Sequence, residues 1–562
     1  MITKTYRRLA SAFILTFLFL FIMNSSCQKS ETARLRFEIS FPASVHAEPI
    51  TGRVFVMISD NDSREPRLQA GSWARSVPFF GLDVENLQPG EVAVIDETAL
   101  GYPPESLRDI PEGDYFVQGL INIYTRFQRS DGHVIWAHMD KWEGQQFNRS
   151  PENLHSTVQS VRLDTEAGYT VALSLDQTIP PVDVPPDTPW VKHIKIQSEM
   201  LSEFWGHPIH IGAIVLLPQG YEEHPDVLYP VHYQQGHFSL RPPYGFRHEP
   251  PEEGNPRARR GYEFYKTWIS EDFPRMFVVT IQHPCPYFDD SYAVNSANCG
   301  PFGDAIITEL IPHLEERFRM IPKPYARVMS GGSTGGWESL AVQVFYPDFF
   351  SGTWPHYPDP IDFRYYLLTN IYEDENAFEK EFGWLTLERP FMRDIHGQVQ
   401  VTLRQLSRME AVLGSKGRSG QQLDIWQAVY GPVGDDGYPR PIWDKLTGKI
   451  DPDVARYFKE NYDLVHIIKR DWKTLGAKLK GKLHVYCGDM DNYYLNEAVY
   501  ELEEFLEGTT DPYYDGVFEY GRPRKGHGWT PFDRASGELE RAMAEHITRV
   551  APPGEDTSRW KY

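Results

Sequence analysis

The pattern of apolar residues changes at one place in the chain, and this change limits the accessible folds more than any other feature of the sequence. From Arg34 to about Asp176, short runs such as Arg53–Ile58 and Tyr115–Ile123 alternate apolar and polar residues between turn residues. Alternation with a period of two, without long helical stretches between the runs, predicts an all-β sandwich. Five prolines in the eleven residues 179–189 then favour an extended, semi-rigid linker.

After the linker, strand-like runs alternate with helix-like segments. Ile209–Leu216 and Met276–Ile281 have the composition of buried strands, and residues 304–318 place five apolar side chains on one helical face. Strands that alternate with helices predict a parallel α/β sheet. From Pro355 to about Leu475 this alternation is lost, in a stretch rich in Trp, Tyr and charged residues. We interpret this stretch as an insertion above the sheet.

Composition and charge narrow the class of protein. With 41% hydrophobic and 24% charged residues, the 562-residue chain is globular. Its 56 Lys and Arg against 78 Asp and Glu give a formal net charge of −22, which repels phosphate backbones and argues against a nucleic acid partner. Four cysteines in so long a chain are not a disulfide framework. Cys285 and Cys299 either form a bridge or remain free thiols, and Cys487 is expected in the core.

The N-terminus has the pattern of an export signal. Basic residues at positions 4, 7 and 8 precede the apolar run Leu9–Met23, and two serines lead to Cys27. This order is typical of a secretory signal peptide, and a cysteine after two serines resembles the lipobox of bacterial lipoproteins. We therefore predict an exported protein, periplasmic or held at the outer membrane of a bacterium by a lipid on Cys27. The alternatives are a plain signal peptide and an uncleaved membrane anchor.

A glycine-rich turn in the α/β part has the pattern of a nucleophile. Residues 331–335, Gly-Gly-Ser-Thr-Gly, fit G-x-S-x-G and lie between the strand-like Arg327–Met329 and a helix-like segment that begins at Trp337. In this motif a sharp turn holds the serine exposed at the end of a strand, and the flanking glycines avoid clashes. Ser333 is therefore the candidate nucleophile, and the backbone N–H of Thr334 is a candidate oxyanion donor. The alternative is a flexible glycine turn without chemistry.

A serine nucleophile needs a base, and the base needs a carboxylate that orients it. In hydrolases with this motif the chain order is serine, acid, histidine. Asp489 and Asp491 follow the late strand-like run 481–486, and His527 lies between two glycines in a later loop. We predict His527 as the base and favour Asp491 over Asp489 as the acid. The alternatives are a surface turn histidine and a strand-end or N-cap carboxylate.

The second oxyanion donor is expected in the loop after an early strand. Gly236 follows the strand-like run 229–234 closely, so the backbone N–H of His237 or Phe238 is the candidate. His232 and His237 are five residues apart but show no H-E-x-x-H pattern, and no other His, Cys and Asp set has zinc-ligand spacing. Glycine motifs for nucleotides do not occur in the sequence either. We therefore expect neither a metal nor an organic cofactor.

Several segments together resemble one esterase family of the α/β-hydrolases. They are Tyr229–Gly236, Tyr292–Ser296, Gly303-Asp304 with Glu309–Leu314, Gly331–Glu338 and Gly526–Trp529. The family includes feruloyl and acetylxylan esterases, S-formylglutathione hydrolases, enterochelin esterases and mycolyltransferases. The resemblance covers about residues 209–550, apart from the insertion, and implies Ser333 as nucleophile, His527 as base and Asp491 as acid. The chain departs from the family pattern at Gln235, where His is frequent, and at Thr334, where Met or Leu is common.

The fold prediction combines these features. We expect an α/β-hydrolase catalytic domain at residues 190–562, with a lid-like insertion at about 355–475. It follows a signal peptide at residues 1–27, an all-β sandwich-like accessory domain at 28–178 and the linker at 179–189.

The function prediction is a serine carboxylic-ester hydrolase that forms an acyl-enzyme and acts on a small-molecule or carbohydrate ester. One alternative is acyl transfer on the same fold, and another is a glycan-binding lipoprotein whose hydrolase domain is inert. We expect the insertion to form a lid or wall over Ser333 that sets substrate choice. The candidate contacts are aromatic residues in and next to it: Trp354, Tyr357, Tyr365, Tyr366, Trp384 and Trp426.

Overall fold

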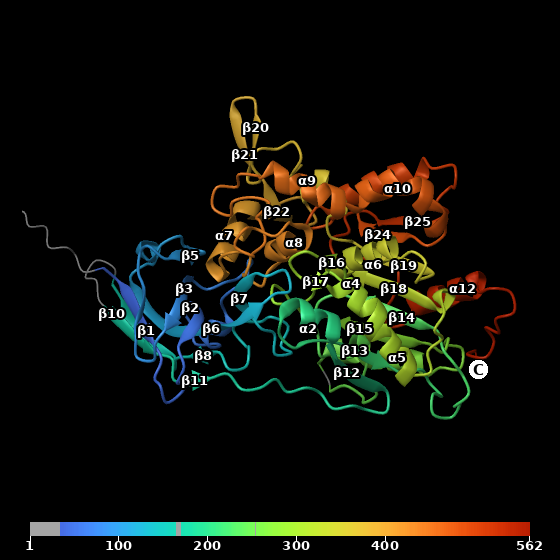
Figure 1. Ribbon diagram of the computed structural model, residues 1–562, viewed down its shortest axis with the longest axis horizontal. Coiled ribbons are helices and arrows are strands. Elements are labelled where there is room, and N and C mark those ends of the chain that lie inside the picture. The colour runs from blue at the N-terminus through green and yellow to red at the C-terminus, as the bar shows by residue number, and fades with distance from the viewer. Residues whose placement is uncertain (1–33, 165–169, 253, 562) are drawn as a thin grey trace, which may run out of the picture.

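The structure, a computed structural model, describes residues 34–164, 170–252 and 254–561. The strands that precede the linker lie at one end of the molecule, and the eight-stranded sheet that follows the linker lies at the other (Figure 1). Cys27 and the rest of the predicted export signal fall outside the described residues. Among the helices that the structure describes, none combines the length and the apolar composition of a membrane span.

The described strands before the linker form two sheets. Their bounds are β1 Arg36–Ser40, β2 Ile50–Ser59, β3 Phe79–Leu87, β4 Ala93–Ile95, β5 Leu100–Tyr102, β6 Gly113–Gln128, β7 Val134–His138, β8 Leu154–His155, β9 Gln159–Leu163, β10 Thr170–Ser174 and β11 Gln177–Thr178. The smaller sheet has the order β10–β1–β4. The larger sheet has the order β11–β8–β6–β2–β3–β5, with β7 and β9 also paired to β6.

Strand β2 is buried on both faces. Val54, Val56 and Ile58 lie in the core of the N-terminal strands, whereas Phe55 and Met57 lie in the core that extends through the rest of the chain. The two sets alternate because successive side chains of a strand point to opposite faces of the sheet. The N-terminal sheet therefore shares a continuous apolar interface with the remainder of the protein.

The larger α/β part is built on an eight-stranded mixed sheet of order β12–β13–β15–β14–β18–β19–β24–β25. The bounds are β12 Val191–Ser198, β13 Ile209–Leu216, β14 Val231–Gln235, β15 Phe277–Gln282, β18 Arg327–Gly332, β19 Gly352–His356, β24 His484–Gly488 and β25 Val517–Gly521. β12 and β13 pair antiparallel, as do β13 and β15, and all strands from β15 to β25 run parallel. The carboxyl ends of the parallel strands meet at one edge of the sheet, where α/β proteins gather their ligands.

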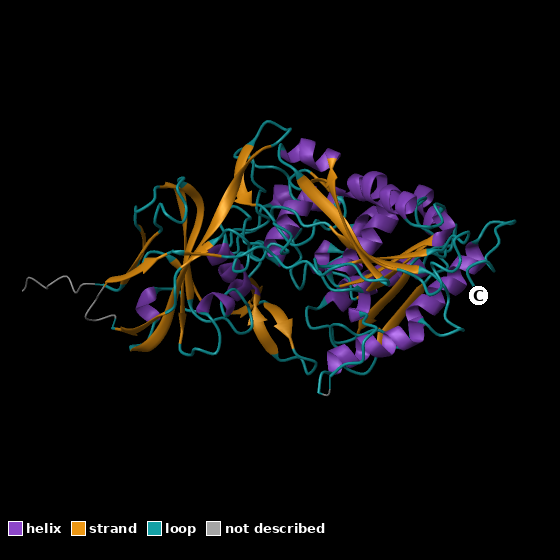
Figure 2. Cartoon of the chain, turned by 90° about the horizontal axis from the view of Figure 1, so that it is seen from below, coloured by secondary structure: helices purple, strands orange, loops and turns teal. Residues whose placement is uncertain are grey.

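Helices cover both faces of this twisted sheet (Figure 2). The described helices are α2 Glu199–Trp205, α3 Pro256–Trp268, α4 Phe302–Ala305, α5 Ile311–Arg317, α6 Thr334–Phe345, α7 Leu403–Leu413, α8 Gln422–Tyr430, α9 Pro452–Asn461, α10 Leu464–Leu479, α11 Leu495–Glu507 and α12 Glu538–Val550. The helix expected at residues 304–318 is interrupted by a π-helical turn at Ile306–Leu310. Pro312 follows in the first turn of α5, and its missing N–H cannot continue the regular hydrogen-bond ladder. The predicted α/β class agrees with this architecture.

The segment between β19 and β24 carries two hairpins as well as helices. The hairpin strands are β20 Glu379–Phe382, β21 Leu385–Glu388, β22 Pro390–Arg393 and β23 Val399–Thr402, and a further short pair, β16 Asn295–Ser296 and β17 Gly300–Pro301, precedes α4. The β20–β21 hairpin projects from the body of the molecule (Figure 1). Helix α10 packs against α6, so it belongs with the helices that cover the sheet. The expected insertion, about residues 355–475, overlaps most of this helix.

Arginine side chains connect the insertion to the N-terminal sheet. Arg53 of β2 is buried and donates from Nε to the carbonyl of Val412 in α7, at 2.7 Å. In the other direction, Arg418 donates to the carbonyl of Trp136 in β7, at 2.9 Å. Buried hydrogen bonds from charged donors are stronger than neutral ones, so these contacts hold the insertion and the N-terminal strands together.

The three described cysteines are free thiols and are buried. Of the two alternatives for Cys285 and Cys299, the structure has the free thiols. Burial, together with the neighbouring Cys299 thiol, raises the pKa of Cys285 well above its usual range. Cys487 lies in the core within β24, as expected.

Candidate active site

Ser333 occupies a strained turn between β18 and α6. Its backbone has φ 58° and ψ −122°, a conformation that costs a non-glycine residue about 1–3 kcal/mol. A Cβ atom on Gly331 would lie 2.1 Å from the carbonyl oxygen of Gly335, and one on Gly335 would lie 2.2 Å from the carbonyl oxygen of Gln235. Both glycines of the motif are therefore required by close backbone approaches. The second approach also brings the turn against the end of β14.

His527 and Asp491 form a direct pair at the same edge of the sheet. The imidazole Nδ1 lies 2.8 Å from Asp491 Oδ2. Asp491 is fully buried, and its Oδ1 accepts the backbone N–H of Tyr493 at 2.8 Å. The imidazole also lies between two tyrosine rings, with centroid distances of 4.6 Å to Tyr357 and 4.8 Å to Tyr493. The carboxylate and the rings together fix the orientation of the imidazole.

Asp489 has a different environment from Asp491. Its two carboxylate oxygens accept the backbone N–H groups of Lys525 at 2.8 Å and Arg524 at 3.2 Å. Asp489 thus holds the loop that carries His527 and does not contact the imidazole through a hydrogen bond.

A further carboxylate, Asp359, lies beside the serine, and the sequence reasoning missed it. The Ser333 hydroxyl donates to Asp359 Oδ1 at 3.2 Å, and Tyr292 and Thr334 donate to Oδ2 at 2.6 and 3.1 Å. Burial raises the pKa of Asp359 above its usual range, although these hydrogen bonds and the nearby His527 oppose that shift. Asp359 follows β19 at the edge where ligands gather, and that position is the one signal that could have identified it.

The loop after β14 brings His237 next to the serine turn. Gly236 has φ 150°, and His237 lines the same cavity as Ser333. The ring of Phe238 packs against Trp142 of the N-terminal part, with centroids 5.1 Å apart. The predicted oxyanion residues Thr334 and His237 thus flank Ser333 from two neighbouring strand ends.

The cavity that contains Ser333 and His527 has a volume of about 790 Å³. The serine end is lined by residues that follow the parallel strands. The other walls come from the segment between β19 and β24 and from two loops of the N-terminal part, one between β2 and β3 and one between β7 and β8. The aromatic side chains that line it are Trp73, Phe147, Phe288, Tyr357, Phe391, Trp426 and Tyr493. A cavity of this size accommodates a ligand larger than a simple acetate ester.

The six aromatic residues expected over Ser333 are distributed differently. Tyr357 and Trp426 line the cavity. Trp354 is buried elsewhere, stacked on His484 at 4.4 Å, and Tyr366 is buried in the core of the insertion. The other two, Tyr365 and Trp384, lie away from the cavity, Trp384 fully exposed on the β20–β21 hairpin.

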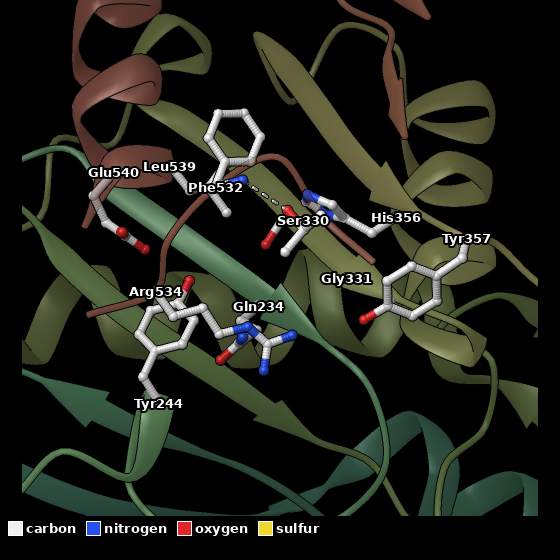
Figure 3. A pocket seen from close by; sticks show the side chains of 12 residues that line it. Gln234, Tyr244, Ser330, Gly331, His356, Tyr357, Phe532, Arg534, Leu539 and Glu540 are labelled. Carbon is white, nitrogen blue, oxygen red and sulfur yellow. Dashed lines mark hydrogen bonds between the residues drawn. The ribbon is translucent and has the colours of Figure 1, made fainter. Parts of the chain in front are cut away.

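A second cavity, of about 50 Å³, is shown in Figure 3. Gly332 and Tyr357 line both this cavity and the one that contains Ser333. Its other walls include His356, Arg534 and Glu540. His356 Nε2 has no hydrogen-bond partner among the described residues, and Glu540 Oε1 lies 3.3 Å from His232 Nδ1. The size and the polar lining suit water better than an ester substrate.

Comparison with known proteins gives remote structural matches. No protein-family model and no curated protein matches the chain. A ferulic acid esterase matches with 15% identity and a TM-score of 0.35, over 64% of this chain and 99% of that one. An S-formylglutathione hydrolase from Agrobacterium tumefaciens matches with 13% identity and a TM-score of 0.33, over 65% and 98%. A feruloyl esterase module from Clostridium thermocellum matches with 11% identity and a TM-score of 0.32, over 66% and 94%. These proteins are of the kinds that the sequence resembles, and at such identities the chemistry has to be inferred from the site itself.

Proposed function

We propose that the protein is a serine carboxylic-ester hydrolase. The observation that carries this proposal is the presence in one cavity of a serine with φ 58° and a histidine paired at 2.8 Å with a buried carboxylate. A strained serine at a strand-to-helix turn and an oriented imidazole are two features of an activated hydroxyl nucleophile. The third, a hydrogen bond from the hydroxyl to the imidazole, is not formed between these described residues, because the Ser333 hydroxyl donates to Asp359. Acyl transfer to an acceptor other than water would use the same groups.

In the proposed reaction, Ser333 Oγ attacks the ester carbonyl while Nε2 of His527 takes its proton. Asp491 holds the imidazole through Nδ1 and stabilises the imidazolium that forms. The backbone N–H groups of Thr334 and His237 are the proposed donors to the oxyanion. The imidazolium then protonates the departing alcohol, and a water molecule, activated by the same imidazole, releases the acid from Ser333.

Asp359 has a proposed role before and during the attack. In the substrate-free protein the serine hydroxyl donates to Asp359 at 3.2 Å. We propose that substrate binding turns this hydroxyl toward His527. The buried carboxylate then favours the imidazolium, because an opposite charge nearby stabilises the protonated form.

The proposed substrate is an ester with a flat, bulky group, such as a sugar ring or an aryl acyl chain. The support for this is the 790 Å³ cavity with seven aromatic side chains on its walls. Trp73 lies in the loop between β2 and β3 of the N-terminal part and contacts Phe391, with centroids 6.1 Å apart. We therefore propose that the N-terminal part takes part in substrate recognition and is more than a spacer.

We also propose that the protein is exported and anchored to the membrane through a lipid on Cys27. The support is the sequence alone, in which basic residues, an apolar run and two serines precede this cysteine. A bacterial lipoprotein of this kind would act on esters in the periplasm or at the outer membrane.

The direct test uses an aryl acetate and a fluorophosphonate that labels activated serines. The wild-type protein should hydrolyse the ester and carry the label on the peptide that contains Ser333. Ser333→Ala should lose the label and at least three orders of magnitude in kcat, because only binding and the oxyanion donors remain. Its melting temperature should stay close to that of the wild type. A variant that retains more than about a tenth of the rate, equivalent to under about 1.4 kcal/mol, would refute the nucleophile assignment.

A further inference from the structure

A group of carboxylates and one imidazole lies beside the Ser333 cavity. His237 Nδ1 is 3.0 Å from Asp289 Oδ1 and 3.2 Å from Asp290 Oδ2. The three side chains offer one nitrogen and two carboxylate oxygens that all lie within 4.8 Å of one another. Asp290 is fully buried, whereas His237 and Asp289 reach the cavity wall. The group is thus half enclosed and open to a small solute from one side.

A fourth acidic side chain, Glu338 of α6, lies behind Asp290. It is fully buried, and neither of its carboxyl oxygens has a hydrogen-bond partner among the described residues. Buried polar atoms are almost always paired, so these oxygens indicate that a partner belongs there.

The protein itself provides little positive charge for this group. Within the described residues, no Lys or Arg forms an ion pair with Asp289, Asp290 or Glu338. His283 lies 3.8 Å from Glu338, but burial lowers the pKa of its imidazole to about 4, so it is neutral near pH 7. His237 is therefore the one nearby group that could carry a counter-charge, against three carboxyl groups.

We propose that His237, Asp289 and Asp290 bind a divalent transition-metal cation, with Glu338 supporting Asp290 from behind. One imidazole nitrogen with carboxylate oxygens suits Zn²⁺ or Mn²⁺, whereas Ca²⁺ prefers an all-oxygen site. Zinc lies about 2.0–2.2 Å from such ligands, so neighbouring ligand atoms around it are separated by roughly 3 Å. The separations of 3.0 and 3.2 Å from His237 Nδ1, which are also hydrogen-bond and ion-pair distances, are compatible with that spacing.

Such a cation would connect three segments that are distant in sequence: the loop after β14, the loop after β15 and helix α6. Because the proposed metal ligands are far apart in the sequence, a search for closely spaced metal-binding residues does not find this site. The cation would also hold the loop whose His237 N–H is the proposed oxyanion donor, and this consequence alone rests on the proposed function. Metal binding itself does not require that the protein hydrolyse esters.

The test is metal binding by the full, tag-free chain after treatment with a chelator. Calorimetry with ZnCl₂ and with MnCl₂ should give one saturable equivalent for at least one of them, with CaCl₂ weaker, and the melting temperature should rise on binding. Asp290→Asn should weaken binding at least tenfold. Asp289→Asn should do the same, and because Asp289 is partly exposed, this variant is the one expected to fold without difficulty.

The matched control is Asp187→Asn. Asp187 is exposed, and its carboxylate lies 3.3 Å from Nδ1 of His193, so the change removes a histidine–aspartate pair outside the proposed metal site. This variant should bind the metal as the wild type does. The proposal is overturned if the wild type takes up no stoichiometric Zn²⁺ or Mn²⁺, or if both Asp289→Asn and Asp290→Asn bind it undiminished. Because the readout is binding, failure here leaves the Ser333 experiment unaffected, and the reverse also holds.

Discussion

Asp491→Asn is the most informative single change at the proposed active site. Asn retains the shape of the buried side chain, and its oxygen still accepts the backbone N–H of Tyr493, which is 2.8 Å from Asp491 Oδ1. Its NH₂ group then faces Nδ1 of His527, 2.8 Å from the replaced oxygen. An NH₂ group donates only to an unprotonated nitrogen, so the imidazole proton moves to Nε2. Nε2 is the nitrogen that has to accept the proton of Ser333, and the base is disabled.

The expected loss in kcat is about 10⁴-fold, equivalent to about 5.4 kcal/mol of transition-state stabilisation. The assay is steady-state hydrolysis of an aryl acetate, together with a melting curve that shows the variant is folded. Asp489→Asn is the matched control, because Asp489 accepts only backbone N–H groups of the His527 loop. It should lose one such hydrogen bond, about 1 kcal/mol, and remain within about tenfold of the wild-type rate. If Asp491→Asn keeps more than a few per cent of kcat, or if Asp489→Asn is equally damaged, the assignment of the acid is wrong.

Three further changes test the surroundings of the site. Asp359→Asn removes a buried charge but keeps its shape, so kcat/KM should fall about tenfold, equivalent to about 1.4 kcal/mol, and an unchanged rate would limit Asp359 to a structural part of the wall. Trp73→Ala should lower kcat/KM for a bulky aryl or sugar ester far more than for an aryl acetate, whereas the exposed Trp384→Ala should change neither; equal losses on both esters would place recognition elsewhere. Cys27→Ala should abolish incorporation of labelled palmitate, and a surviving label would refute the lipid anchor.

The α/β part was predictable because its signals are local and strong. The run Ile209–Leu216 coincides with β13, since a continuous apolar run bounded by proline and glycine has few other ways to fold. The glycines around Ser333 are required by backbone approaches near 2 Å, so the motif specifies its own turn. His527 and Asp491 could be predicted from chain order, because parallel strands carry the segments that follow them to one edge of the sheet. Their separation of 2.8 Å is consistent with the prediction that pairs them.

Side-chain direction in the insertion could not be predicted in the same way. Tyr366 is completely buried, Trp384 is completely exposed and Trp426 lines the cavity, although all three are aromatic residues in one segment of similar composition. The difference arises from packing between parts of the chain that are distant in sequence. Strand β2 of the N-terminal part shows the same effect. One of its faces, with Phe55 and Met57, packs into the core formed by the rest of the chain, and local sequence does not predict this contact.

This shared core has a consequence for the active site. A β domain that is connected to its neighbour only by a flexible linker can change its position relative to that neighbour. A sheet whose second face is packed against the neighbouring domain is held in one position. The loops that carry Trp73 and Phe147 pack against this shared core, so they can provide a stable wall of the Ser333 cavity. Alternation with a period of two predicts the strands, but it does not show what covers each face of the sheet. A face that packs inside its own domain and a face that packs against another domain both need apolar residues. The contribution of the N-terminal part to the substrate cavity could therefore not be predicted from the sequence pattern and follows only from the folded structure.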